Sequence, residues 1–391
     1  VAMCCVRSFN NARACYIQRI DEKGAVMAFQ LPVYHHPDFA ALGLDDAPNV
    51  RWGTVEQNGV IPEGFHSTSM YPEYFKIDGS WRLASSSRMD ACIVLRDDGT
   101  LHVVTGRHLK QGDLVALGRS EDGSDGIYVH TDGFADPAAS NGEKFSFRQG
   151  RSRETAYTRD YDDLIELLKY ERDHGFIEWV MGPAFAFDAD SRHAMQRLVE
   201  EGYVHALSGG NALATHDLEG AMFHTALGQD IRTQQSMPNG HYNHLDTINR
   251  VRRSGSIAQF VDVYDLHDGI MYACVKKNIP FLLAGSIRDD GPLPETIADV
   301  YESQHQIRVL ARKATTVICM ATMLHTIATG NITPSYHVDD DGTVRPVYIY
   351  AVDASEFVVN KLHDRGSLSA KTIVTNVQDF IFIVAKGLGV L

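Results

Sequence analysis

The stretch YVHALSGGNALATHDLEGAMFHTALG, residues 203–228, decides the fold of this chain. Its apolar start, Tyr203–Leu207, predicts a buried strand, and a helical stretch follows from Leu218 to Leu227. The intervening residues Ser208–Asp217 then predict a loop at the carboxyl end of the strand. A strand, a short connection and a helix in this order form the repeating unit of a parallel α/β sheet.

Two adjacent glycines, Gly209 and Gly210, open this connection. Glycines here let the backbone turn sharply and let a phosphate approach the free amides of a helix N-terminus. The spacing is not GxGxxG, so a plain strand-to-helix connection is the alternative. The nearby ligand-type side chains of Asn211, His216 and Asp217 favour ligand binding, because a plain connection needs none of them.

The rest of the second half repeats this alternation of apolar runs and amphipathic stretches. Helices are predicted at Asp162–Arg172 and Ser191–Glu201. The predicted strands, besides Tyr203–Leu207, are Ile177–Met181, Pro280–Ala284, Thr315–Cys319, Val347–Val352 and Thr372–Thr375. We therefore predict an α/β fold with a parallel sheet, whose ligands bind at the carboxyl ends of the strands.

The first half of the chain has a different pattern. Short β-rich runs such as Cys92–Leu95 and Leu114–Leu117 are broken by turn residues, and long helical periodicity is scarce. The pattern changes between residues 148 and 158. We predict a β-rich α+β domain over residues 1–150, which contributes to the substrate cleft, and a sheet domain over residues 151–391.

Composition excludes several classes of protein. The 391 residues carry 36 basic and 50 acidic side chains, a formal charge of −14, which repels nucleic acid and acidic membranes. No secretory signal or apolar membrane span is evident. The six cysteines lack the paired CxxC spacing of a zinc site, so we expect reduced thiols in a soluble cytoplasmic protein, without a metal.

Charged residues follow the predicted strand Pro280–Ala284. Ser286, Arg288, Asp289 and Asp290 lie in a loop bounded by glycine and proline. An arginine there could grip a carboxylate, and an aspartate could hold ribose hydroxyls or accept a proton from an amine. The alternative is an ordinary solvated turn, since Asp-Asp-Gly-Pro is typical turn chemistry.

Three weaker candidates, Asp353, Thr375 and Asn376, lie at the ends of the last two predicted strands. They could line an adenosine or ribose pocket, but single polar residues at strand ends also cap helices. His241 and His244 are three residues apart, which suggests a metal. Because no third ligand stands at a persuasive spacing, a loop that contacts ligand or solvent is the preferred interpretation.

In the first domain, Arg88 and Asp90 enter the strand that begins at Cys92. If the strand already runs through them, both side chains lie on one face. They would then either pair with each other or point into a cleft between the domains.

Long runs of this sequence resemble one family, the NAD-dependent archaeal-type ornithine cyclodeaminases of the lysine-oxoglutarate reductase/saccharopine dehydrogenase-like group. The same family forms the C-terminal part of cyanobacterial arginine dihydrolases. In the second domain the resemblance rests on LSGGNALATHDLEGAMFHTALG (207–228), HYNHLDTINRVRRSGSI (241–257), GIMYACVKKNIPFLLAGSIRDDGPLPE (269–295), MATMLHTIATGN (320–331) and RGSLSAKTIVTNV (365–377). In the first domain it rests on VIPEGFHSTSMYPEYFKIDGSW (60–81) and RMDACIVL (88–95).

The resemblance implies a Rossmann-like, deoxyhypusine-synthase-like domain that binds NAD. By motif position it implies that Gly209, Gly210, Asn211 and Ala212 cradle NAD, with Ser286, Asp289 and Asp290 near the nicotinamide ribose or the substrate. Asp353, Thr375 and Asn376 are additional cofactor candidates. The acid/base stays open among Asp289, Asp290 and Asp90, and either Arg88 or Arg288 could hold the substrate carboxylate.

The resemblance further implies an ammonia-lyase that converts ornithine to proline by transient oxidation of the α-carbon. Three alternatives stay open: an amino-acid or opine-type dehydrogenase, a cyclodeaminase of another diamino acid, and a non-catalytic NAD-binding or assembly protein. Residues 1–55 depart from the family pattern, which keeps the substrate open. We expect a homo-oligomer whose partner is a small amino acid, with neither nucleic acid nor membrane as a partner.

Overall fold

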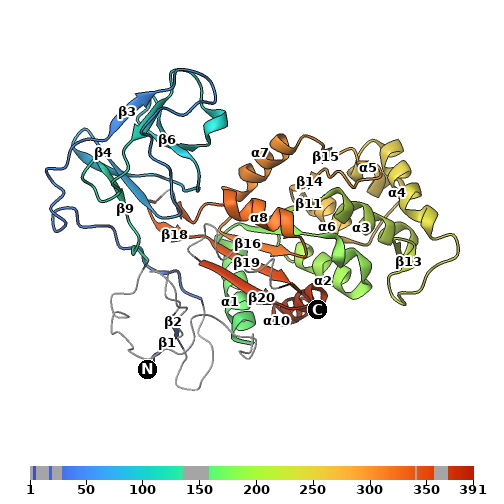
Figure 1. The fold of residues 1–391 in the computed structure, drawn as a ribbon. Helices are drawn as coiled ribbons and strands as arrows, with labels where there is room; N and C mark the ends of the chain where they lie inside the picture. The colour runs from blue at the N-terminus through green and yellow to red at the C-terminus, as the bar shows by residue number, and fades with distance from the viewer. Residues whose placement is uncertain (1–2, 6–16, 20–28, 135–157, 340, 356–368) are drawn as a thin grey trace. The chain divides into compact units, whose positions relative to one another are not determined.

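The computed structural model describes residues 3–5, 17–19, 29–134, 158–339, 341–355 and 369–391 (Figure 1). These residues form two compact units. The first unit takes its residues from 1–156, 331–348 and 365–369, and the second from 157–330, 349–364 and 370–391. The second unit contains the predicted sheet.

A seven-stranded sheet in the order β15-β14-β11-β10-β16-β19-β20 is the centre of the second unit (Figure 1). Its strands are β10 (Ile177–Met181), β11 (Ala206–Gly210), β14 (Phe281–Ala284), β15 (Thr296–Ile297), β16 (Thr316–Met320), β19 (Tyr348–Asp353) and β20 (Ser369–Val374). The pairs β10–β11, β10–β16, β11–β14 and β14–β15 are all parallel. The predicted α/β class is confirmed. From β10 the strand order first runs to β11, β14 and β15 on one side, and the later strands β16, β19 and β20 are added on the other side.

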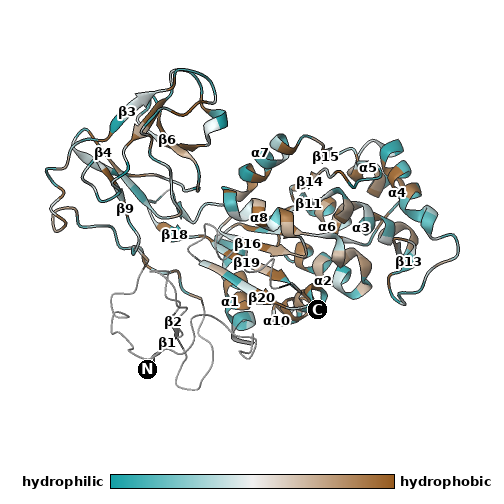
Figure 2. Ribbon diagram, in the orientation of Figure 1, coloured by the Kyte–Doolittle hydropathy of each residue, from teal (hydrophilic) through white to brown (hydrophobic). Residues whose placement is uncertain are grey.

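Helices surround this sheet, and all five residues of β10 are buried, as expected for a strand covered on both faces. Apolar α10 packs on α2 and appears brown along most of its length in Figure 2. The helices are α1 (Thr158–His174), α2 (Ala189–Glu200), α3 (Asn211–Phe223), α4 (His241–Ser254), α5 (Ile257–Val263), α6 (Ile270–Lys277), α7 (Val300–Ala311), α8 (Met323–Ile332) and α10 (Val377–Gly387). The short elements are η3 (Pro183–Phe187) and the hairpin strands β12 (Thr225–Ala226) and β13 (Gln229–Asp230).

The predicted loop over Ser208–Asp217 is wrong. β11 continues through Gly210, and α3 begins at once at Asn211. Gly209 is required for close packing rather than for a sharp turn, because a Cβ there would lie 2.9 Å from the carbonyl oxygen of Met181 on β10. The backbone of Gly210 is extended, with φ −91° and ψ 163°. His216 and Asp217 therefore lie inside a helix.

The first unit contains the β-rich region that the sequence predicts. Its sheets are β3-β8-β6-β7 and β5-β4-β9, and their core includes Phe75, Ile93 and Ile127. The strands are β3 (Arg51–Thr54), β4 (Glu73–Ile77), β5 (Ser80–Leu83), β6 (Cys92–Leu95), β7 (Leu101–Val104), β8 (Leu114–Leu117) and β9 (Ile127–Val129), with η1 at Gly106–His108 and a separate pair β1 (Met3–Cys5) and β2 (Ile17–Arg19).

A hairpin from much later in the chain also belongs to the first unit. It consists of β17 (Tyr336–Val338) and β18 (Val344–Pro346). The Tyr336 hydroxyl donates a 2.6 Å hydrogen bond to the carbonyl oxygen of Ala84, and the Ser335 amide donates a 2.9 Å hydrogen bond to the Ser87 hydroxyl. The predicted division into residues 1–150 and 151–391 has one boundary, whereas each unit is built from three separate segments of the chain.

Among the described residues, no helix is both long enough and apolar enough to span a membrane. Cys92, Cys274 and Cys319 are free thiols and are buried. Burial raises the pKa of the Cys92 thiol to about 11, so this cysteine packs as a small apolar group.

Candidate functional site

The carboxyl edge of the sheet is the first place to look for a ligand, and within it the point where the strand order reverses, between β10 and β16. Gly182 follows β10, and its amide donates a 2.8 Å hydrogen bond to the carbonyl oxygen of Met320. A Cβ at Gly182 would collide with the backbone of Ala321, so the two loops lie directly against each other. This contact fixes the strand ends on either side.

The N-terminus of α3 lies beside this point, at the carboxyl end of β11. Gly210 is its N-cap residue and no side chain caps the helix. A Cβ at Gly210 would lie 3.3 Å from Cε1 of His325, so α8 approaches the start of α3 closely here. A helix N-terminus without a side-chain cap presents amide groups and a partial positive charge to an anion such as a phosphate.

The side chain of Asn211, one of the predicted cofactor residues, forms hydrogen bonds within the protein. It is buried, and its Oδ1 accepts hydrogen bonds of 2.9 Å from the Leu293 amide and of 2.9 Å from the Thr296 hydroxyl. The side chain thereby ties the start of α3 to the segment that leads into β15. Its neighbour Ala212 is half-buried and has only backbone polar groups.

The loop after β14 carries the predicted acidic and basic residues. The Asp289 carboxylate accepts a 2.8 Å hydrogen bond from the Ser286 amide, and the Ser286 hydroxyl accepts one of 3.1 Å from the Arg288 amide. Arg288 and Asp290 are exposed. Asp289 and Ser286 thus shape the turn, and the other two side chains lie at the surface of this unit.

The candidates at the far end of the sheet lie together at the carboxyl ends of β19 and β20. Asp353 accepts a 2.8 Å hydrogen bond from the Ser355 amide, and its carbonyl oxygen accepts one of 3.1 Å from the Thr375 amide. Asn376 is the N-cap of α10 and accepts a 2.8 Å hydrogen bond from the Gln378 amide. The capping alternative therefore describes the Asn376 side chain.

Arg88 and Asp90 belong to the first unit. β6 begins only at Cys92 and Asp90 has a φ of 56°, so the two residues do not share a strand face. Arg88 is half-buried, and within the described part of the chain its Nε has no hydrogen-bond partner. Burial and the nearby charge of Arg107 lower the pKa of the Arg88 guanidinium to about 10.

His325 on α8 is a candidate site residue that sequence reasoning missed. Its Nδ1 lies 3.4 Å from the Thr322 hydroxyl, and burial lowers its pKa below the ordinary value of a histidine. The imidazole is therefore neutral at pH 7 and able to accept a proton. It stands in the run MATMLHTIATGN, where a single histidine among apolar residues carries no chemical signal.

A second missed group joins α3 to α4. His216 and Glu219 are buried on α3, and His244 lies on the first turns of α4. The expected loop around His241 and His244 is wrong, because a 14-residue helix begins at His241. The sequence offers no third ligand close to His241 and His244. Glu219 supplies one in the fold, because α3 packs against α4 and brings it to His244.

Asp217, in contrast, is a structural residue. It is fully buried and accepts a 2.9 Å hydrogen bond from Nε of Arg192, whose side chain is also buried. The same carboxylate accepts hydrogen bonds from the amides of Ile270 (3.1 Å) and Met271 (2.8 Å), which begin α6. The ion pair therefore fixes α6 to α2 and α3.

Known proteins share this architecture and sequence. The family described as arginine dihydrolase ArgZ-like, C-terminal, Rossmann fold matches residues 164–384. An ornithine cyclodeaminase from Methanocaldococcus jannaschii is 38% identical over 353 residues, which cover 88% of this chain and 79% of the relative. The chain belongs to the ornithine cyclodeaminase family. It is an enzyme of this family, and its second unit has the Rossmann fold of the ArgZ-like C-terminal region.

Two solved structures are similar to this family member over most of its length. The conserved LOR/SDH protein from Methanococcus maripaludis S2 is 33% identical, with a TM-score of 0.78, and the match covers 88% of this chain and 98% of the other. The AgrE structure determined as a ternary complex with ornithine and NAD+ is 33% identical, with a TM-score of 0.55. That match covers 88% of this chain and 46% of the other. The predicted family is confirmed.

Proposed function

We propose that this enzyme is an NAD-dependent cyclodeaminase that converts ornithine, or a closely related diamino acid, into a cyclic imino acid and ammonia. For ornithine the product is proline. The observation that carries the proposal is the N-terminus of α3, which lacks a side-chain cap and lies beside a neutral His325 at the carboxyl edge of the sheet. The relation to an AgrE structure that holds ornithine and NAD+ supports it.

The residues at the sheet edge fit NAD. The backbone at Gly209–Ala212 offers the pyrophosphate the amides at the start of α3, and at Gly210 the absence of a Cβ leaves space beside His325. Asp353, Thr375 and Asn376 lie on the other side of β10, where the second half of a dinucleotide would extend. Bound there, NAD supplies a reversible acceptor for the electron pair of the α-carbon–hydrogen bond of the substrate.

The protein's own residues must then move protons. The δ-ammonium of ornithine has to lose a proton before its nitrogen can bond to the α-carbon, and the departing α-nitrogen has to gain one. His325 is suited to this exchange, because its burial keeps it neutral. Asp289 and Asp290 remain candidates, although Asp289 already accepts a hydrogen bond from the Ser286 amide.

The α-carboxylate of the substrate needs a cation, and the two candidate arginines differ. Arg288 is exposed on a turn, where water solvates its charge. Arg88 is half-buried, with an Nε that has no hydrogen-bond partner in the described residues. A partly buried guanidinium with an Nε that still has a hydrogen bond to donate gains more from a carboxylate than a solvated one does, so Arg88 is the preferred residue for this role.

Incubation of the purified enzyme and NAD with a panel of diamino acids tests the proposal. Ammonia and reduced nicotinamide are measured separately, and the product is identified by mass spectrometry. We expect one ammonia per proline from ornithine and no accumulation of reduced nicotinamide. Accumulation in step with ammonia would assign an amino-acid dehydrogenase instead, and ammonia from another diamino acid alone would change the substrate.

A further inference from the structure

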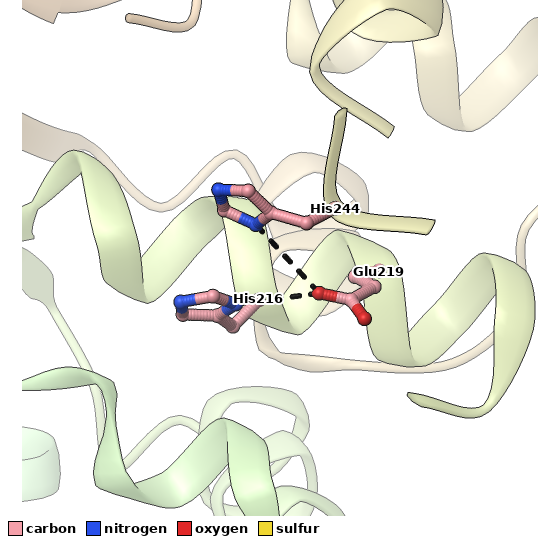
Figure 3. A group of neighbouring side chains, drawn as sticks. All are labelled: His216, Glu219 and His244. Atoms are coloured by element: carbon pink, nitrogen blue, oxygen red, sulfur yellow. Dashed lines mark hydrogen bonds and ion pairs between the residues drawn. The ribbon is translucent and has the colours of Figure 1, made fainter. Parts of the chain in front are cut away.

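Three side chains with metal-ligand chemistry meet between α3 and α4: His216, Glu219 and His244. One ligand atom from each lies within 4.8 Å of the other two. Figure 3 shows the two imidazole rings on the same side of the Glu219 carboxylate, each with its Nδ1 toward Oε2. Nothing in the proposed cyclodeamination uses this group.

The separations in this cluster are those of ligands rather than of strong hydrogen bonds. Nδ1 of His216 lies 3.3 Å and Nδ1 of His244 lies 3.7 Å from Oε2 of Glu219. A charge-assisted hydrogen bond is shorter, roughly 2.7–2.9 Å. Two ligand atoms at about 2.0–2.2 Å from one tetrahedral ion lie roughly 3.4 Å apart, which is close to the two distances from Oε2.

The surroundings hold the Glu219 carboxylate in place. Its Oε1 accepts hydrogen bonds from the Thr225 hydroxyl (2.8 Å) and from the Gly228 amide (3.1 Å). The Thr225 hydroxyl accepts one of 2.9 Å from the Asn243 side chain on α4. Oε2 accepts a 3.2 Å hydrogen bond from the Leu227 amide. Such outer contacts orient a ligating carboxylate, and Oε2 keeps a lone pair for an ion.

The two histidine rings stack, with centroids 4.9 Å apart and planes 29° apart, and both present their Nδ1 atoms to the same carboxylate. In the described part of the chain, Nδ1 of His244 is buried without a hydrogen-bond partner.

We infer that His216, Glu219 and His244 bind a divalent transition-metal ion such as Zn²⁺. Two imidazole nitrogens and one carboxylate oxygen form a ligand set typical of zinc, and three protein ligands leave one position for water or another ligand. The His244 side chain is 18% exposed, which provides a route for the ion. A further carboxylate, that of Asp290, lies on the other side of the ring, with its Oδ2 3.7 Å from Nε2 of His244.

Metal titration of the full chain, after treatment with a chelator and dialysis, tests this site. Zn²⁺ binding is measured by calorimetry, and Co²⁺ binding by the visible absorption of the tetrahedral ion. We expect one tight site per chain. His244→Ala should weaken it by at least about 100-fold and remove the tetrahedral Co²⁺ bands, because one of three ligands is lost.

His241→Ala is the matched control, since His241 is exposed on the same helix and lies outside the cluster. It should bind Zn²⁺ like the unaltered chain. Glu219→Gln provides a second ligand variant, and circular dichroism checks that each variant is folded. Absence of a tight site in the unaltered chain, or equal affinity of the folded His244→Ala and His241→Ala variants, would overturn the inference. Neither result depends on turnover, so it leaves the cyclodeaminase proposal to its own test.

Discussion

His216 and Asp217 are neighbours on α3, yet their surroundings differ in kind. Asp217 faces α2 and α6, where Arg192 and two helix amides supply close donors. His216 faces α4, where its contact with Glu219 is long and a buried nitrogen of His244 lacks a hydrogen-bond partner among the described residues. A buried charge with short contacts to fixed donors holds the fold. A group of potential ligand atoms with long contacts is suited to bind something else.

The largest effect should come from Asp217→Ala. Removal of the carboxylate leaves Arg192 buried without its main partner, and loss of one member of a buried ion pair costs about 3–5 kcal/mol. We expect the free energy of unfolding, measured by denaturant titration, to fall by this amount. Asp268→Asn is the control, because Asp268 is 46% exposed in its pair with Arg192 and should change stability much less. A similar small loss for both variants would contradict the structural role of Asp217.

Glu178 on β10 is a buried carboxylate of a third kind, and within the described ranges its only donor is the Ser208 hydroxyl, at 2.6 Å. Burial raises its pKa to about 7. Because the folded pKa exceeds the unfolded value near 4.5, its ionisation destabilises the fold progressively between pH 4.5 and 7. Glu178→Gln should therefore leave stability unchanged below pH 4.5 and increase it by about 3 kcal/mol above pH 7.

Thermal unfolding of both proteins across this pH range measures the difference. A constant difference between Glu178→Gln and the unaltered chain from pH 4 to 8 would show that the carboxylate does not titrate in this interval.

His325→Gln should affect turnover rather than stability. Loss of a positioned proton acceptor lowers kcat by about 100-fold or more, whereas the unfolding midpoint should move little. In the unaltered enzyme, kcat/KM should fall only when the pH drops below the ordinary pKa of histidine, because burial lowers the pKa of His325. A variant with full activity, or an acid limb that the substitution does not alter, would remove His325 from the mechanism.

The smallest effect on stability should come from His244→Ala. The side chain is partly exposed, and its polar contacts with Glu219 and Asp290 are long, so the free energy of unfolding of the metal-free chain should change by less than about 1 kcal/mol. Added Zn²⁺ should raise the midpoint of the unaltered chain and leave that of the variant unchanged. An equal rise of the unfolding midpoint in both proteins would show that His244 does not bind the ion, and the proposed difference between His216 and Asp217 would be lost.

The sequence predicts repeated elements better than it predicts their junctions. The five-residue strand Ile177–Met181 is predicted with the bounds that the structure has, because its apolar run is unbroken. The loop predicted at Gly209 is wrong, because Gly209 permits close packing of β11 beside β10 instead of forming a turn. Local sequence does not distinguish these two uses of a glycine pair.

The candidate site was predictable only in part, because it depends on contacts distant in sequence. Asn211 and Asp217 look alike as polar residues near a strand end, but only the folded chain shows that one holds Leu293 and the other Arg192. Glu219 and His244 are 25 positions apart, and no ligand spacing connects them before α3 and α4 pack together. Resemblance supplied the family, and the structure supplies the partners.

Isotope tracing with [2-²H]ornithine in unlabelled water tests the proposed cyclodeamination most directly. If the hydrogen removed from the α-carbon returns to it within one turnover, the enzyme with NAD will form proline that retains the deuterium at this carbon, together with one equivalent of ammonia. Mass spectrometry of the proline measures the retention. Proline with hydrogen from water at the α-carbon, or an oxidised product with deuterated nicotinamide, would contradict the account.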